Sequence, residues 1–319
     1  MVRRNRPMEK ISTPRLLVVG GSGFIGRHVA AFGVRKGWRV TSLSIGPHSA
    51  PELEPGVTYL SADLTNSHSL SEIPNSPFEY IVNLAGYVDH TPFKEGGRRL
   101  IDSHFNGLVN LLQCLNRKAI KRFVQIGSSD EYGNAPAPQH ESLRECPGSP
   151  YALAKLACTH FLQMLSREEG FPVVILRLFL IYGPGQNKQR FLPQVIEGCL
   201  GNRSFPVSEG RQLRDFCYIN DLVDAIYKCF ENSEINGHII NIASGIPIEI
   251  RHIVHEITEL VGGGQPQFGQ IAYRQGENMA LYGNINIAKQ LLGWEPKTPL
   301  YLGLKTTIES MKLNADYGR

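Results

Sequence analysis

One stretch near the start of the chain constrains its fold most strongly. An apolar run at residues 16–19 leads directly into glycines with the spacing Gly20-x-x-Gly23-x-x-Gly26, and a helical pattern follows. A strand that enters such a turn and then a helix is the unit with which βαβ proteins hold a dinucleotide. Gly20 permits the tight turn, Gly23 lets the backbone approach a pyrophosphate, and Gly26 lets the helix pack close to the strand.

The helix after this turn begins near Phe24, so Phe24 and Ile25 lie in its first turn. The N–H groups at a helix start have no partner within the helix and attract phosphate charge. We therefore expect Phe24 and Ile25 to bind the cofactor together with the three glycines. A plain glycine-rich turn is the alternative interpretation.

Apolar runs alternate with helical patterns through the first half of the chain. This alternation predicts right-handed crossovers and an α/β fold, in which a doubly wound parallel sheet carries helices on both faces. The expected strands are 15–20, 38–43, 57–60, 79–84, 121–127 and 172–178, and the expected helices are 24–36, 67–72, 98–116 and 150–169.

The pattern becomes less regular after residue 178. It predicts helices at 191–200, 220–232, 249–261, 286–292 and 300–312, and a strand at 238–242. We expect a dinucleotide-binding Rossmann domain of residues 1–178, to which residues 214–245 return. Residues 179–213 and 246–319 are expected to form a smaller substrate-binding lobe over the cofactor cleft.

Composition narrows the class of protein further. The chain has 319 residues, of which 42% are apolar, and its net charge of +4 gives no case for nucleic acid as a partner. No run of about 18 apolar residues predicts a membrane span, and the basic start lacks the apolar region of a secretory signal. The six cysteines form no C-x-x-C pair and the histidines no H-E-x-x-H, so we expect a cytoplasmic protein without disulfides and without metal.

Tyr151 and Lys155 lie four residues apart in the expected helix 150–169 and therefore share one face of it. A phenol acts best as a general acid or base when its pKa is near the working pH, and a nearby ammonium favours the phenolate. We expect Lys155 to lower the pKa of Tyr151. The spacing alone arises often by chance, and its position after a dinucleotide turn is what favours a catalytic function.

The segment Ser128-Ser129-Asp130 follows the expected strand 121–127. A hydroxyl at a strand end can donate a hydrogen bond to a substrate oxygen on which charge develops. A simple turn rich in Ser, Asp and Gly is the alternative. Asn106 lies inside the expected helix 98–116, where asparagine is more often packed or solvated than functional.

Together these residues resemble the extended short-chain dehydrogenase/reductase family, which contains nucleotide-sugar epimerases, dehydratases and reductases. The resemblance runs from residue 16 to about residue 304, and the order of its motifs is specific. Further matching pieces are Asp63-Leu64, Asn83-Leu84-Ala85, Asn106-Gly107, Arg177, Tyr182-Gly183-Pro184-Gly185, Arg214-Asp215-Phe216, Asp221, Arg274-x-Gly276-Glu277 and Leu292-Gly293-Trp294.

The resemblance implies a role for each matching residue. The catalytic residues would be Ser128, Tyr151 and Lys155. The cofactor would be bound by Asp63, Leu64, Leu84, Ala85, Asn106 and Lys155, and the nucleoside-diphosphate sugar by Ser129, Asp130, Arg214 and Arg274. The family's homodimers imply that helices 98–116 and 150–169 pair with their copies in a second subunit, although the same apolar spacing also fits burial against the sheet.

Departures from the family pattern narrow the choice of cofactor and of substrate. Ser44 stands where the family's NAD enzymes usually carry an aspartate, so we expect Ser44 at the cofactor. An aspartate would repel a 2′-phosphate and a serine does not, so we prefer NADP to NAD. Arg27 and His48 are the candidate cations for that phosphate. Leu180 replaces an asparagine that usually contacts the substrate, which puts the usual substrate pose in doubt.

The residues after the serine strand end bear on the reaction type. Ser129 and Asp130 stand where dehydratases of the family typically carry Asp and Glu, which weakens a 4,6-dehydratase assignment. The segment is most similar to the 4-ketosugar reductases, including those acting on GDP-4-keto-6-deoxy-mannose. We therefore expect an oxidoreductase that reduces a 4-keto-6-deoxyhexose linked to a nucleoside diphosphate. A 4-epimerase is the second choice, a dehydratase the third, and a non-catalytic dinucleotide sensor the alternative from another class.

Overall fold

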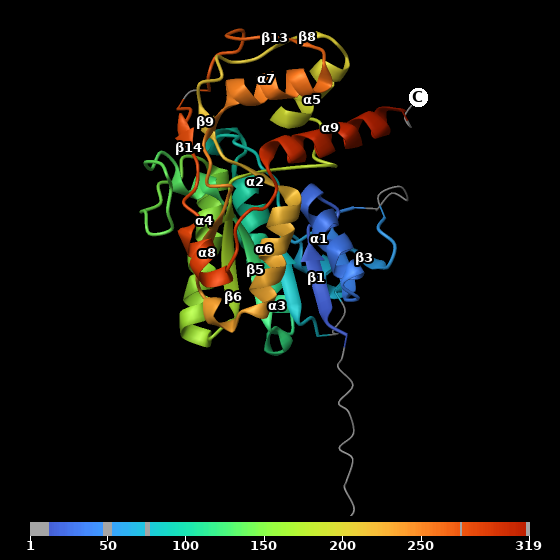
Figure 1. The fold of residues 1–319 in the computed structure, drawn as a ribbon. Coiled ribbons are helices and arrows are strands. Elements are labelled where there is room, and N and C mark those ends of the chain that lie inside the picture. Colours follow the sequence, from blue (N-terminus) through green and yellow to red (C-terminus); the bar gives the residue numbers. More distant parts are fainter. Residues whose placement is uncertain (1–12, 47–52, 74–76, 275, 317–319) are drawn as a thin grey trace, which may run out of the picture.

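A computed structural model describes residues 13–46, 53–73, 77–274 and 276–316 of the chain (Figure 1). Its main sheet has seven parallel strands in the order β11-β6-β5-β4-β1-β2-β3. The strands are β1 (Arg15–Val19), β2 (Arg39–Ser44), β3 (Val57–Ser61), β4 (Tyr80–Asn83), β5 (Arg122–Ser128), β6 (Val173–Leu178) and β11 (Ile239–Ile242). This sheet confirms the predicted α/β class with a doubly wound, Rossmann-like topology.

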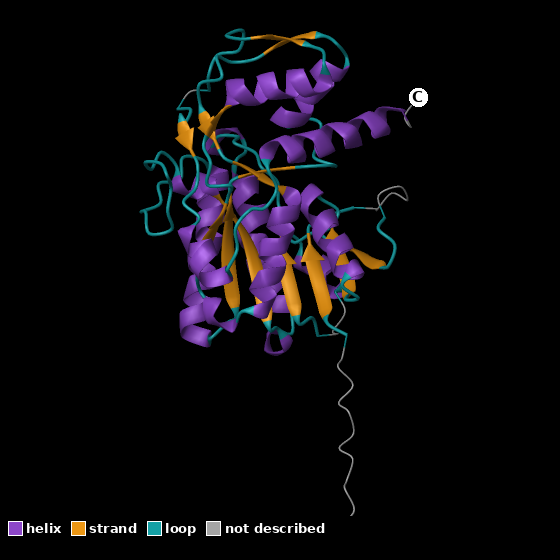
Figure 2. Cartoon of the chain, viewed as in Figure 1, coloured by secondary structure: helices purple, strands orange, loops and turns teal. Residues whose placement is uncertain are grey.

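Helices cover both faces of this sheet (Figure 2). Because successive strand residues point to opposite faces, Leu16 and Val18 of β1 pack toward one set of helices and Leu17 and Val19 toward the other. The first set contains α1 (Phe24–Arg35) and α6 (Ile219–Glu231), and the second contains α3 (Gly107–Cys114) and α4 (Pro150–Glu169).

The remaining elements gather mainly above the carboxyl ends of the sheet strands (Figure 1). Here lie the helices α5 (Phe191–Leu200), α7 (Ile250–Val261) and α9 (Leu300–Asp316) and two small sheets. One sheet joins β8 (Ser204–Pro206) to β13 (Gln265–Gln267), and the other joins β9 (Leu213–Arg214), β12 (Ile248–Glu249) and β14 (Ala280–Leu281). The helix α8 (Asn286–Leu292) instead packs beside β11.

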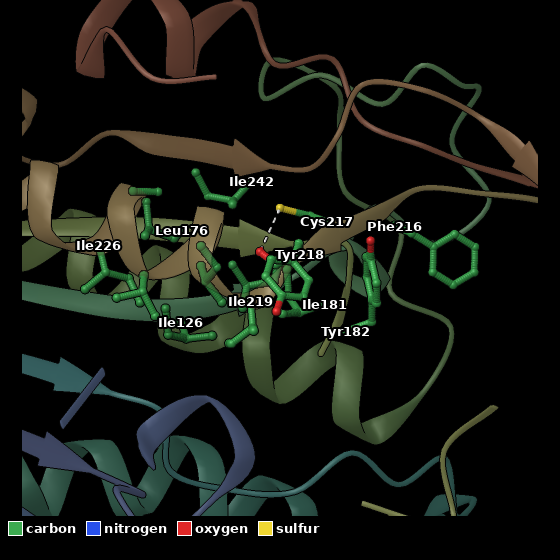
Figure 3. Close-up of a cluster of buried hydrophobic side chains, with 14 of the residues drawn as sticks. Ile126, Leu176, Ile181, Tyr182, Phe216, Cys217, Tyr218, Ile219, Ile226 and Ile242 are labelled. Carbon is green, nitrogen blue, oxygen red and sulfur yellow. Dashed lines mark hydrogen bonds between the residues drawn. The ribbon is translucent and has the colours of Figure 1, made fainter. Parts of the chain in front are cut away.

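A short parallel pair connects these upper elements to the main sheet. The pair consists of β7 (Leu180–Tyr182) and β10 (Phe216–Tyr218). Its side chains join the apolar core that the sheet forms with α6, so one continuous hydrophobic cluster runs from the sheet into the upper part (Figure 3). Burial of this kind supplies most of the free energy that holds two such layers together.

Two hydrogen bonds also link the turn after β7 to α1. The Arg27 guanidinium donates to the carbonyl oxygen of Gly185 over 3.1 Å, and Nε2 of His28 lies 2.9 Å from the carbonyl oxygen of Pro184. The start of α1 and the turn after β7 are therefore joined directly.

The expected elements agree with the observed ones except in one helix. Residues 98–116 were expected to form a single helix, but α2 (Arg98–Ile101) and α3 are separated by a π-helical turn at Asp102–Asn106. Short 3-10 helices occur at Ser67–Glu72, Phe93–Glu95, Arg117–Ala119, Ser129–Tyr132 and Ser233–Ile235. Within the described residues, no helix is both long and apolar enough to cross a lipid bilayer.

Candidate active site

The glycine turn has the geometry that a dinucleotide phosphate requires. Gly20 has a φ of +80° and its N–H donates to the Leu43 carbonyl over 2.7 Å, while a Cβ at Gly26 would overlap the Gly20 carbonyl. Gly23 is the N-cap of α1 and offers no side-chain cap, and the first turn carries no acidic residue. The N–H groups of Phe24 and Ile25 thus begin a helix whose start stays open to an anion, so these residues fit a pyrophosphate.

Ser44 lies at the carboxyl end of β2, where the family's ribose contact is expected. Its hydroxyl accepts a hydrogen bond from the Ser22 N–H over 3.0 Å and thereby joins β2 to the glycine turn. Arg27, expected near this point, instead directs its guanidinium to the turn at Gly185. His48, the second expected cation, lies outside the described residues.

The other expected cofactor residues follow β3 and β4. The Asp63 carboxylate accepts from the N–H and the hydroxyl of Thr65, each over 2.8 Å, and Leu64 is buried. Leu84 donates its N–H to the end of β1, and the Asn83 side chain accepts from the Ala85 N–H over 3.2 Å. All four residues sit just beyond strand ends, at the edge of the sheet where α/β proteins bind their ligands.

Asn106, the remaining expected cofactor residue, has an exposed side chain that donates to Asp102 over 2.8 Å. It lines a surface hollow together with Thr65, which directly follows Asp63-Leu64. His104, two residues earlier in the π-helical turn, is only 5% exposed and contacts the Tyr151 ring. The extra residue in a π turn changes which side chains share a face, and such turns are frequent at functional sites.

His104 contacts three parts of the site. Its Nε2 lies 3.0 Å from the Tyr87 carbonyl, its ring meets the Tyr151 ring edge to face at 5.3 Å, and a Cβ at Gly86 would overlap it. Since a carbonyl only accepts, Nε2 carries the proton. Burial first, and then the charge of Lys155, lower the pKa of His104 to about 3, so the ring is neutral at neutral pH.

The structure brings the three expected catalytic residues together. Tyr151 and Lys155 lie in the first two turns of α4 and are 4% and 5% exposed, and the side chains of Tyr151 and Ser128 share a hydrogen bond. Lys155 Nζ lies 6.0 Å from the centre of the Tyr151 ring and donates to the Ile126 carbonyl over 2.9 Å. Pro150 at the helix start and the Ser149 hydroxyl, which accepts from the Ala152 N–H, fix this end of α4.

The pKa of Tyr151 is raised overall, whereas the spacing to Lys155 predicted that it would be lowered. Burial first, and then the Asp130 carboxylate, raise the pKa of Tyr151 well above its usual value, although the hydrogen bond with Ser128 acts in the opposite direction. Burial also lowers the pKa of Lys155, because a buried ammonium loses its hydration. Tyr151 is therefore a protonated phenol at neutral pH and can act as a proton donor.

A buried network of ionic side chains lies beneath Ser128. It consists of Glu131, Thr159, Arg177 and Glu145, and we call it the buried network. Glu131 accepts from the Ser128 N–H over 2.8 Å, from the Thr159 hydroxyl over 2.8 Å and from Arg177 Nε over 2.9 Å. Arg177 also donates to Glu145 over 2.7 Å. Because Thr159 belongs to α4, Glu131 fixes Ser128 relative to the helix that carries Tyr151.

The residue before Glu131 faces the opposite way and belongs to a second cluster. We call this cluster the open rim, and it comprises Asp130, His90, Arg190, Arg214 and Arg274. Burial raises the pKa of Asp130, whereas the charges of His90 and of the three arginines lower it. The structure thus brings the expected substrate residues Asp130, Arg214 and Arg274 within electrostatic reach of one another, and Asp130 also acts on Tyr151.

The two expected arginines have different surroundings. Arg214 is buried and donates to the Leu213 carbonyl over 2.8 Å and to Glu277, whereas Arg274 is exposed. Ser129 is buried at the start of its 3-10 helix, and Leu180 of β7 is 38% exposed. The rim therefore combines a fixed guanidinium with more exposed ones, and guanidinium groups suit diphosphate oxygens.

Comparison with known proteins identifies the family. The sequence model of the NAD dependent epimerase/dehydratase family matches residues 16–243. The chain belongs to this family. It is 25% identical over 323 residues to the UDP-glucuronate 4-epimerase of Thermodesulfobacterium geofontis, covering 94% of this chain and 97% of the relative. It is 28% identical over 313 residues to the GDP-6-deoxy-D-mannose reductase of Pseudomonas aeruginosa, covering 93% and 96%.

A solved structure shows the same fold. The UDP-glucose 4-epimerase of Thermotoga maritima, determined with UDP-glucose, superposes with a TM-score of 0.87 at 24% identity, and the match covers 94% of this chain and 99% of that one. The chain is thus an enzyme-family member whose relatives act on nucleotide sugars as epimerases, dehydratases and reductases. Within the described residues, no three His, Cys, Asp or Glu side chains gather to hold a metal ion.

Three parts of the candidate site were not predicted from the sequence, although the sequence contains a pattern that indicates two of them. His104 is a polar residue on the buried stripe of its helix, between Leu100 and Leu108. Ser128-x-x-Glu131 is the sequence pattern of a capping box, which the structure contains. The positions of His90 and Arg190 at the rim depend on loop conformation and had no such signal.

Proposed function

We propose that the chain reduces the 4-keto group of a 6-deoxyhexose linked to a nucleoside diphosphate. The observation that carries this proposal is the buried, protonated Tyr151, hydrogen-bonded to Ser128 and placed beside a rim of arginines. A protonated phenol is the form that can donate a proton to an alkoxide. The similarity to a GDP-6-deoxy-D-mannose reductase supports the same direction of reaction.

In this proposal each residue has one task. The glycine turn would hold a nicotinamide dinucleotide, which would supply the hydride for the sugar carbonyl. The Ser128 hydroxyl donates a hydrogen bond to the carbonyl oxygen, which stabilises the charge that develops there. Tyr151 then donates its proton to that oxygen, and the positive charge of Lys155 in the next turn of α4 favours the phenolate that remains.

The substrate side of the proposal rests on the open rim. Arg214 and Arg274, joined by Arg190, would bind the diphosphate, and Ser129 and Asp130 would contact the sugar. Leu180 presents an aliphatic side chain where an amide is usual, which fits a sugar position that lacks a hydroxyl, such as a 6-deoxy carbon. We propose accordingly that residues 179–213 and 246–319 form the substrate-binding lobe.

We propose NADPH as the preferred cofactor and NADH as the alternative. Ser44 places a hydroxyl and not a carboxylate at the end of β2, so this residue does not repel a 2′-phosphate. The engagement of Arg27 with Gly185 weakens this preference, because it leaves one fewer cation for the phosphate. The ratio of kcat/KM for NADPH and NADH decides between them, and a ratio below one would reverse the preference.

A 4-epimerase is the second candidate, supported by the similarity to a UDP-glucuronate 4-epimerase. It would use the same three residues but keep its nicotinamide and return the hydride to the other face of the sugar. A dehydratase ranks third, because Ser129 supplies a hydroxyl where a carboxylic acid is needed.

One assay separates these candidates. Purified protein is incubated with NADPH and, separately, with GDP-4-keto-6-deoxymannose, dTDP-4-keto-6-deoxyglucose, UDP-glucose and UDP-glucuronate. A reductase consumes NADPH in proportion to ketosugar, whereas an epimerase converts a UDP-sugar without net change in nicotinamide absorbance. No NADPH consumption with either ketosugar would refute the leading proposal.

We further propose that the protein forms a cytoplasmic homodimer. Leu153 and Met164 of α4 are exposed apolar side chains on a helix that the family uses for subunit contact. Light scattering after gel filtration tests the dimer, and a monomer at micromolar concentration would refute it.

A further inference from the structure

The edge strand β11 borders a hollow that is separate from the candidate active site. The hollow has a volume of about 460 Å³, and we call it the edge hollow. It lies between α4, the amino end of β11, the start of α8 and residues 140–142, on the side of the molecule where Figure 1 shows α4 and α8. Small-molecule sites have volumes of about 300–1,000 Å³. None of the described residues that line the edge hollow belongs to the candidate active site, which lies at the carboxyl ends of the sheet strands.

Side chains that both donate and accept hydrogen bonds line the edge hollow. They are the amides of Gln163, Asn284 and Asn286 and the imidazoles of His140 and His238. An amide has two donors and an acceptor oxygen, and a neutral imidazole has one donor and one acceptor. A ligand that fits here must therefore offer several polar groups of both kinds.

The charge of the lining disfavours other classes of ligand. No arginine or lysine is among the described residues that line the hollow, and an anionic ligand usually requires such residues. The carboxylate in this lining, Glu141, already accepts from the Asn241 N–H over 2.8 Å. An apolar ligand would leave the amides and imidazoles without hydrogen bonds, which is unfavourable.

An uncharged sugar matches this lining. Its hydroxyl groups donate and accept as the amides and imidazoles do, and its C–H groups can pack on Ile239 and Ile287. Two of the polar side chains, His238 and Asn286, are exposed and form no hydrogen bond with another described residue. A ligand can bind these two side chains without breaking a hydrogen bond of the fold.

Two walls of the edge hollow meet at Asn241. The N–H of Asn241 donates to Glu141, and its side-chain amide donates to the Asn284 carbonyl over 3.3 Å. The side-chain oxygen of Asn241 accepts from the Tyr132 hydroxyl over 2.8 Å. A ligand that moves Glu141 or Asn284 therefore also acts on Tyr132.

Tyr132 in turn contacts the buried network. Its ring centre lies 4.6 Å from the Arg177 guanidinium, which donates to Glu131. Glu131 accepts from the Ser128 N–H. The edge hollow and the candidate catalytic Ser128 are thus joined by one continuous set of buried contacts.

We propose that the edge hollow is a second ligand site, which binds an uncharged sugar and thereby changes the rate of turnover at the candidate active site. The same chemistry fits a free sugar and a sugar unit of a glycan. The regulatory step rests on the reductase function proposed above, whereas the binding step does not depend on it. The sugar changes turnover only if it binds two arrangements of the buried contacts with different affinity.

Isothermal titration calorimetry with the full-length protein tests the binding. Mannose, glucose and the 6-deoxyhexoses rhamnose and fucose are titrated at millimolar concentrations, and mannobiose tests a sugar unit of a glycan. At least one of them should bind.

Variants of the lining locate the bound sugar. His238→Phe and Asn286→Leu each remove a hydrogen-bonding group and should raise the dissociation constant about threefold, and the double variant should raise it about tenfold. Asn116→Leu replaces an exposed asparagine that does not line the hollow and should bind like the wild type. Circular dichroism should show that all variants are folded.

Steady-state kinetics with NADPH and the ketosugar nucleotide test the regulation. A saturating concentration of the bound sugar should change kcat about fivefold, which is comparable to the usual coupling between two sites. A sugar that only competed at the open rim would raise KM and leave kcat unchanged. Tyr132→Phe lacks the hydroxyl that binds Asn241, so it should bind the sugar like the wild type but show a smaller change in kcat.

The outcomes separate the two proposals. The sugar site is overturned if none of the sugars binds, or if the double variant binds them as tightly as the wild type. If a sugar binds there but the wild type reduces neither ketosugar, the reductase function fails while the site stands. If the wild type is active, the regulatory step is overturned by an unchanged kcat at saturating sugar or by an equal change in Tyr132→Phe.

Discussion

Asp130 and Glu131 are adjacent in the chain, yet their carboxylates belong to two regions of opposite character. Glu131 is fully buried and its oxygens accept from Ser128, Thr159 and Arg177. Asp130 belongs to the open rim, where the charges of three arginines act on it. Two neighbouring residues of one 3-10 helix thus belong to different regions. In one region the ionic groups bind each other, and in the other they are accessible to a ligand.

The charged side chains of the buried network and those of the open rim serve different purposes. The buried network fixes Ser128 relative to α4 through Glu131 and Thr159, so its contribution is a fixed geometry. In the open rim, Arg190, Arg214 and Arg274 outnumber the carboxylates of Asp130 and Glu277. An anionic ligand can complete the balance there, whereas in the buried network Arg177 is already paired with Glu131 and Glu145.

Tyr151 lies where the two regions meet, and its loss should have the largest effect. We expect Tyr151→Phe to lower kcat by about 10²–10⁴-fold, because the phenol is the proton donor. The dissociation constant of the dinucleotide, measured by fluorescence quenching, should change less than twofold. Turnover near the wild-type rate would contradict the proposed role.

Breaking the buried network should cost the most stability. Arg177→Met leaves Glu131 and Glu145 in the interior without their partner, and removing one member of a buried ion pair costs about 3–5 kcal/mol. Urea denaturation should show this decrease in the free energy of unfolding. The matched rim variant, Arg274→Gln, should change it by less than about 0.5 kcal/mol, and equal losses in both variants would remove the distinction between the regions.

The buried His104 predicts a pH dependence of stability. Its pKa is lowered to about 3 in the fold, against about 6.5 in an unfolded chain. Above pH 6.5 neither state binds the proton, and below it only the unfolded state does, so stability falls as the pH falls toward 3. Between pH 7.5 and 5 the loss should be about 2 kcal/mol. Parallel urea titrations of the wild type and His104→Gln should differ by this slope, and identical slopes would disprove it.

The smallest effect is expected at the outer part of the rim. Arg274→Gln removes a positive charge from the proposed diphosphate site and should raise KM for the sugar nucleotide about tenfold, with kcat nearly unchanged, as expected for a charge-assisted hydrogen bond. Arg251→Gln, which removes an exposed arginine paired with Glu209 on α7, is the control. A larger effect in the control than in Arg274→Gln would place the substrate elsewhere.

The sequence predicted the fold well because the fold depends on local, periodic signals. The boundaries of β1, β5, β6 and α4 were predicted to within a residue or two, since apolar strands and a Ser-Pro helix start are readable directly. The π-helical turn at Asp102–Asn106 was not predicted, because it hardly changes the spacing of apolar residues along the helix. The contact of His104 with the Tyr151 ring was therefore not predicted either.

The sequence predicted that the candidate catalytic residues lie together, but it did not predict their electrostatics. Ser128, Tyr151 and Lys155 converge as expected, from segments that a parallel sheet brings to one edge. The sign of the Tyr151 pKa shift was wrong, because a spacing shows the ammonium but not the depth of burial or the Asp130 carboxylate. The pairing of Arg214 with Glu277 likewise depends on how loops 63 residues apart are folded together.

The two hydrogen bonds between α1 and the turn at Pro184-Gly185 have a mechanical consequence. Because α1 begins at the glycine turn and residues 184 and 185 lead from β7 into the upper elements, these bonds tie the phosphate-binding end of the sheet to the upper part of the molecule. A separation of the two layers at this point would have to break both of them.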